Sequence, residues 1–131
     1  GAEWTDDGVR YEAPELGATD KVSTRLEQEP RGGDPEHTSM SISLLRFNSS
    51  EGAAAAYQAT LSTKKGEPSN WTLPYEGMAF RQGNESDRSY DVIFLKRDFV
   101  CFMQIVHVST SVQDCDCEME RLVREQWAQI Q

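Results

Sequence analysis

The sequence predicts an α+β fold in which an antiparallel sheet of about four strands carries two helices packed on one face. Three observations support this prediction. Residues 38–47 alternate between apolar and polar side chains, residues 50–66 combine good helix formers with helix-end signals, and residues 89–108 hold two apolar runs separated by Arg97-Asp98. Period-two alternation is typical of a half-buried strand, and a short connection between apolar runs is typical of a hairpin.

The first expected strand, at residues 38–47, alternates three apolar residues with three serines. A helix is expected to follow. Asn48 offers a side-chain oxygen as N-cap, Glu51 can complete a capping box, and Gly66 is placed to end the helix. The alanines at residues 53–56 favour helix and allow close packing on a sheet.

A further strand, opened by Gly77, is expected at residues 78–80. The two hairpin strands are expected at residues 89–96 and 99–108, and a last helix is expected near residues 114–130, where apolar residues are spaced for one buried face. The predicted order is β-α-β-β-β-α after an acidic N-terminal arm. Each helix has one apolar stripe, so both are expected on the same face of the sheet.

The chain is expected to divide into a partly flexible arm at residues 1–37, with one short strand at residues 9–12, and a single domain at residues 38–131. Ten acidic and four basic side chains lie in residues 1–36, so this segment holds −6 of the formal net charge of −9. Two prolines and two glycines between residues 30 and 35 interrupt regular structure.

Charge and hydropathy limit the expected partners. A strongly acidic chain repels phosphate backbones, so we expect no nucleic-acid partner. No window approaches the ~18 consecutive apolar residues that a membrane span needs. The start at Gly1-Ala2-Glu3-Trp4 lacks an initiator Met and is interpreted as a mature sequence from which a signal peptide or N-terminal anchor has been removed. We therefore expect a periplasmic or secreted protein.

The three asparagines of the chain, Asn48, Asn70 and Asn84, each begin an Asn-x-Ser/Thr acceptor pattern. Such a pattern is used only in a secretory pathway that reads it. The sequence leaves the use of these three patterns open.

The cysteines leave three interpretations open. Cys115-Asp116-Cys117 follows the last expected strand closely enough to return near Cys101. A disulfide from Cys101 to Cys115 or Cys117 would contribute ~2–3 kcal/mol. Alternatively, the thiols are free and buried. In the third interpretation, Cys115 and Cys117 hold a soft metal together with His107, Asp116 or Glu118, although structural zinc sites use wider ligand spacings.

No pattern in the sequence predicts catalysis or a cofactor. His37 is expected in a polar loop and His107 at a strand end, and neither has an Asp or Ser partner placed by spacing. The sequence contains no nucleophile elbow, no phosphate-binding glycine loop and no calcium loop. We therefore expect no catalytic residues.

Four segments carry a family resemblance: Arg46-Phe47 at a strand end, residues 50–54 opening a helix, Gly77-Met78-Ala79 before a strand, and residues 94–100 as a hairpin. Together they resemble exported bacterial domains, often borne by lipoproteins and of unassigned function, with a PsbP-like α/β sandwich. The resemblance covers residues 38–131 and implies no catalytic residues. Asp98 stands where Gly or Asn is typical, and the Cys-x-Cys pair lies outside the pattern.

The sequence thus favours a non-enzymatic extracytoplasmic module that binds a protein or a small-molecule ligand through one sheet face or a cleft under the N-terminal arm. The alternative is a metal-handling or thiol-redox protein that uses Cys101, Cys115 and Cys117. No pattern identifies the ligand or the oligomeric state.

Overall fold

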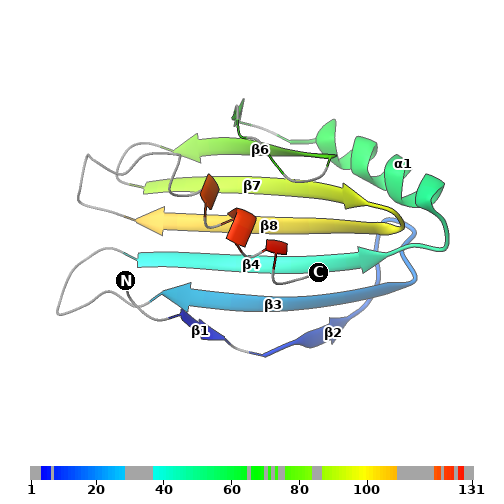
Figure 1. The fold of residues 1–131 in the computed structure, drawn as a ribbon, viewed down its shortest axis with the longest axis horizontal. Helices are drawn as coiled ribbons and strands as arrows, with labels where there is room; N and C mark the ends of the chain where they lie inside the picture. The colour runs from blue at the N-terminus through cyan, green and yellow to red at the C-terminus, as the bar shows by residue number, and fades with distance from the viewer. Residues whose placement is uncertain are drawn as a thin grey trace.

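The computed structural model describes residues 4–6, 8–28, 37–64, 66–69, 71, 73, 76–83, 87–108, 120–121, 123–125 and 127–128. Its main element is one antiparallel sheet with the strand order β1-β3-β4-β8-β7-β6-β5, in which β2 also pairs with β3 (Figure 1). The eight strands are β1 (Trp4–Asp6), β2 (Arg10–Glu12), β3 (Asp20–Gln28), β4 (His37–Arg46), β5 (Glu67–Pro68), β6 (Glu76–Gly83), β7 (Asp87–Lys96) and β8 (Phe99–Val108). The helix α1 (Ser50–Leu61) and helical residues between 120 and 128 complete the described fold.

Strands β4, β8 and β7 form the centre of the sheet, and each has 10 residues. The β7–β8 hairpin turns at Arg97 and Asp98, and Lys96 pairs with Phe99. Arg97 has φ 55°, the left-handed conformation that a two-residue hairpin turn requires. The Phe47 backbone N–H donates to the Asp98 carbonyl (2.8 Å), which ties the end of β4 to this turn.

The two faces of the sheet carry two separate cores. Neighbouring residues of β8 alternate between them, because Cys101 and Met103 belong to one buried cluster and Val100 to the other. The same alternation holds in β7, where Ile93 lies between Val92 and Phe94 of the opposite cluster. Successive side chains of a strand point to opposite faces. Both faces are therefore partly covered.

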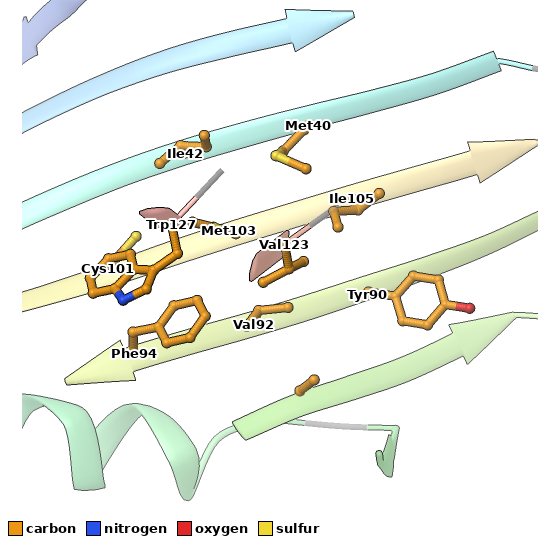
Figure 2. Close-up of a cluster of buried hydrophobic side chains, with 11 residues drawn as sticks. Met40, Ile42, Tyr90, Val92, Phe94, Cys101, Met103, Ile105, Val123 and Trp127 are labelled. Carbon is orange, nitrogen blue, oxygen red and sulfur yellow. The ribbon is translucent and has the colours of Figure 1, made fainter. Parts of the chain in front are cut away.

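Helical residues near the C-terminus cover the first core (Figure 2). Val123 and Trp127 are buried in the same cluster as Met40, Val92 and Phe94. The rings of Trp127 and Phe94 stack with centroids 4.5 Å apart and an interplanar angle of 9°. This contact joins the chain's last described segment to the centre of the sheet.

Helix α1 covers one end of the opposite face. Its buried residues Ala53, Ala56 and Tyr57 share a cluster with Ile93 and Val100. The N-cap is Ser49, whose Oγ accepts a hydrogen bond from the Gly52 N–H (3.0 Å), so the expected cap at Asn48 was wrong by one residue. The small alanines allow the helix to pack close to the strands.

The predicted α+β fold of about four strands with two helices on one face is wrong. Within the described residues the sheet has eight strands, and three of them come from the first 28 residues, which the prediction placed in an arm outside the sheet. The two helical segments also bury their apolar residues in different clusters on opposite faces. The strand at residues 38–47 and the hairpin lie where they were expected, and β2 matches the short strand expected at residues 9–12. The first helix begins as expected but ends at Leu61, with its C-cap at Ser62 and not at Gly66.

Trp127→Ala is expected to lower the free energy of unfolding by ~3–5 kcal/mol, because it removes a buried aromatic side chain and leaves a cavity over Phe94. Urea denaturation followed by circular dichroism measures this loss. Arg124→Ala is the matched control on the exposed side of the same segment, and its ion pair with Glu120 (3.8 Å) predicts a loss below ~1 kcal/mol. Equal losses in the two variants would contradict the packing described here.

Candidate functional site: a polar groove on the sheet

A polar groove lies on the sheet face that carries α1, next to the last turn of that helix. It encloses a cavity of about 450 Å³. Side chains from four strands, from α1 and from the segment before β3 line it. Its floor and walls include Glu15, Leu16, Lys21, Ser41, Ser43, Thr60, Thr63, Lys64, Asp91, Phe102 and Gln104.

Strand register brings the floor residues together. Ser43 pairs with Phe102, and Ser41 pairs with Gln104, which in turn pairs with Asp91 on β7. Paired residues of antiparallel strands point to the same face, so these side chains form two adjacent rows across the sheet. Because serine side chains are short, the floor is low over β4 and the face is hollowed there.

Ion pairs stand at both sides of the groove. On the β3 side, the Lys21 ammonium lies 3.3 Å from Glu15 Oε1 and 3.4 Å from Glu12 Oε2. On the β7 side, Lys64 Nζ from the segment that follows α1 lies 3.8 Å from Asp91 Oδ2. All four groups of the two pairs Lys21–Glu15 and Lys64–Asp91 line the cavity, so its walls carry no net formal charge.

Neighbouring groups stabilise the charges on the β3 side. The hydrogen bond from the Ser23 hydroxyl, followed by that from Lys21, lowers the pKa of the Glu12 carboxyl below its ordinary value of 4.5. Partial burial acts to lower the pKa of Lys21, but the hydrogen bonds and charges of Glu15 and Glu12 outweigh it and raise that pKa above 10.5. Lys21 is therefore a fixed cation at neutral pH.

The rim above β3 is a tight turn at residues 15–18. The Ala18 N–H donates to the Glu15 carbonyl (2.9 Å), and the two central residues Leu16 and Gly17 have φ 58° and 85°. Both angles are positive, as in a turn that prefers Asn, Asp or Gly. Leu16 nevertheless occupies the first position, and its side chain is 52% exposed at the groove. The turn is tied to the sheet by the Thr19 N–H, which donates to the Arg46 carbonyl (2.8 Å).

The cysteines predicted as a disulfide or metal site lie away from the groove or outside the described residues. Cys101 is a free thiol, completely buried in the core under Trp127, and burial raises its pKa. The predicted disulfide from Cys101 to Cys115 or Cys117 is therefore not formed in the structure. Cys115 and Cys117 themselves fall outside the described residues. Within the described part of the chain, no three His, Cys, Asp or Glu side chains are grouped to hold a metal ion.

His107 lies on the opposite face from the groove, in a buried polar row. It pairs in register with Thr38 on β4 and with Arg88 on β7, and all three residues are buried. The Thr38 Oγ1 lies 2.8 Å from His107 Nδ1. His37 is the first residue of β4, where a polar loop was expected. Asn48 is exposed between β4 and α1, whereas Asn70 and Asn84 lie outside the described residues.

None of the groove residues was predicted as a site. A signal was present in Ser41 and Ser43, which belong to the alternation of residues 38–47 and were interpreted as the solvent side of a strand. The same outward alternation continues in Phe102 and Gln104 of β8 and in Asp91 of β7. These residues lie side by side only because β4, β8 and β7 are neighbours in the sheet. No local sequence pattern specifies that strand order.

The fold is similar to that of a solved extracellular domain, that of PknH from Mycobacterium tuberculosis. The TM-score is 0.61, the sequence identity is 7%, and the match covers 95% of this chain and 84% of that chain. Likeness at this identity shows the fold alone. No protein-family model and no curated protein matches the sequence, so the resemblance to PsbP-like lipoprotein domains gains no support. None of the described helices has the length and apolar run needed to cross a bilayer.

Ser23→Ala is expected to raise the pKa of Glu12 toward 4.5, because the variant removes the largest cause of its lowered value. Glu12 stabilises the fold at pH values above its ordinary pKa, and this contribution is lost as the pH falls through the lowered one. A ¹³C NMR titration of the carboxyl group measures the midpoint. Lys21→Met serves as comparison and should also raise the midpoint, because it removes both a hydrogen bond and a positive charge. An unchanged midpoint in Ser23→Ala would show that the hydrogen bond is absent in solution.

The Cys101 thiol is expected to react with Ellman's reagent only after denaturation, because it is fully buried and its pKa is raised. The measurement uses a Cys115→Ser/Cys117→Ser double variant, so that Cys101 is the sole thiol. Rapid reaction of the native double variant would contradict the burial of this side chain.

Proposed function

We propose that this chain is a non-enzymatic extracytoplasmic binding module that takes a small polar ligand in the polar groove. The groove itself carries the proposal. Its cavity of about 450 Å³ falls in the range of small-molecule sites, roughly 300–1,000 Å³. Convergent hydroxyl, amide and charged groups at its surface are the kind of polar groups that orient a ligand.

The residues that line the groove are held in place by strand pairing, ion pairs and a backbone hydrogen bond, which favours a preformed site. The floor of the groove is formed by residues of β4, β8 and β7, and these strands are paired over their whole length. Lys21 is held by two carboxylates, and the rim turn is tied to β4 by the Thr19 hydrogen bond. Side chains fixed on paired strands lose little freedom on binding, which lowers the cost of association.

The extracytoplasmic part of the proposal is supported by the shared fold with an extracellular domain, at 7% identity. The acidity of the chain is compatible with an exported module and disfavours nucleic acid as partner. A fusion of alkaline phosphatase to the full-length gene product tests the location, because that enzyme is active outside the cytoplasm.

No observation among the described residues favours the alternative of metal handling or thiol redox chemistry. The thiol of Cys101 is shielded from solvent, and its raised pKa disfavours the reactive thiolate.

Filling the groove is expected to abolish ligand binding. The probes are single amino acids, sugars, dicarboxylates and nucleosides, added to ¹⁵N-labelled protein, and the readout is the shift of backbone amide resonances. At least one class should shift the amides of Ser41, Ser43, Phe102 and Gln104 in the wild type. Ser43→Trp should abolish those shifts, because the indole occupies the cavity over the floor.

The matched control is Gln58→Trp, which adds the same side chain at an exposed position of α1. Its shifts should equal those of the wild type. Shifts that persist in Ser43→Trp, or that map to another surface, would refute the groove as the binding site.

A further inference from the structure

We infer that the ligand of the polar groove is a neutral saccharide, a mono- or disaccharide. This inference rests on the proposed function of the groove and deepens it by naming the chemical class of the ligand. It follows from the charge balance, from the hydroxyl-rich lining and from the apolar side chains of Phe102 and Leu16 beside these polar groups.

The charges of the groove are already balanced. Lys21 lies 3.3 Å from Glu15, and Lys64 lies 3.8 Å from Asp91. An anionic or cationic ligand would have to compete with one of these pairs, and an anion would also meet the field of a chain with net charge −9. A neutral ligand can bind beside both pairs and leave them intact.

The uncharged polar groups of the lining match the chemistry of a sugar. Ser41 and Ser43 each offer a hydroxyl that donates and accepts, and Gln104 offers an amide that does both. The hydroxyls of Thr60 and Thr63 donate to backbone carbonyls of α1 (2.8 Å each) and offer their oxygens as acceptors. A sugar presents many hydroxyls with the same dual capacity. The paired charges add strength, since hydrogen bonds with an ionised partner are stronger than neutral ones. A mixed set of donors and acceptors therefore suits a polyol better than a ligand of one polarity.

Phe102 and Leu16 supply an apolar part to the site. Phe102 lies beside Ser43 in the floor and is half-buried against the core under α1. An aromatic side chain gives the C–H face of a pyranose an apolar surface, while the hydroxyls at the ring edge reach polar groups. Leu16 adds an exposed apolar contact at the rim.

The backbone of Leu16 strengthens this argument. A left-handed conformation is unfavourable at a residue other than Gly, Asn or Asp. The side chain gains little from burial in return, because it is half exposed. A contact with a bound ligand gives a reason for leucine at this position.

Titration of matched sugars by amide chemical shifts tests the inference. Glucose, N-acetylglucosamine and maltose are the neutral probes, glucosamine and glucuronate are the charged analogues, and alanyl-alanine is a zwitterionic probe of another class. At least one neutral sugar should shift the amides of the groove floor. The charged analogues should bind at least tenfold more weakly, because each disturbs a balanced ion pair.

Phe102→Leu should weaken sugar binding by about 2- to 12-fold, the range expected for loss of an aromatic contact. Phe99→Leu is the matched control, since Phe99 lies on the same strand, faces away from the groove and does not line it. Leu16→Asn should weaken binding while raising the melting temperature, because Asn relieves the backbone strain of the turn. Circular dichroism verifies that each variant is folded.

The outcomes separate this inference from the proposed function. If alanyl-alanine or a charged sugar shifts the groove amides and no neutral sugar does, the saccharide inference is overturned and the groove remains a binding site. If no probe shifts those amides, the inference and the proposed function are both overturned. Equal losses of affinity in Phe102→Leu and Phe99→Leu would likewise overturn the saccharide inference.

Discussion

The full-length pairing of β4, β8 and β7 is the interaction on which the rest of the structure depends. The three strands are paired in register, so every row of paired residues sends its side chains to a single face. On one face, the apolar side chains form a continuous surface on which Trp127 and Val123 pack. On the other face, α1 packs over Ile93 and Val100. A slip of one residue in either pairing would send the apolar rows to the wrong faces and separate both helical segments from their cores.

The groove exists because α1 covers its face only in part. The helix packs where the outward residues are large and apolar, as at Leu45 and Val100, and its last turn ends beside the rows of Ser43 and Ser41. Two ion pairs then border the uncovered area, one made by Lys21 of β3 and one made by Lys64, which follows the helix. The same alternation that builds the core thus also places polar side chains on the uncovered area, and their low height makes it concave.

Local patterns predicted the elements that local chemistry determines. The alternation of residues 38–47, the alanine-rich helix and the hairpin at Arg97-Asp98 are all present in the structure. The strand β3 was missed although Val22, Thr24 and Leu26 alternate with charged and polar residues, because the acidic composition around it suggested an arm. The placement of the helices on opposite faces, and of Lys21, Asp91 and Gln104 around one cavity, depends on strand order and long-range pairing. Those properties are absent from any single stretch of sequence.

The wide sequence spacing of the groove residues has a thermodynamic consequence. Glu15 and Gln104 are separated by most of the chain, and the groove forms only when β3, β4, β8 and β7 are assembled. A peptide excised from the protein cannot reproduce this surface, so the binding-competent state coincides with the native state. Any occupant of the groove must then act on the whole folding equilibrium by mass action. Ligand binding to such a module would raise its resistance to unfolding and to proteolysis. This stabilisation would extend to the Trp127 contact on the far side of the sheet.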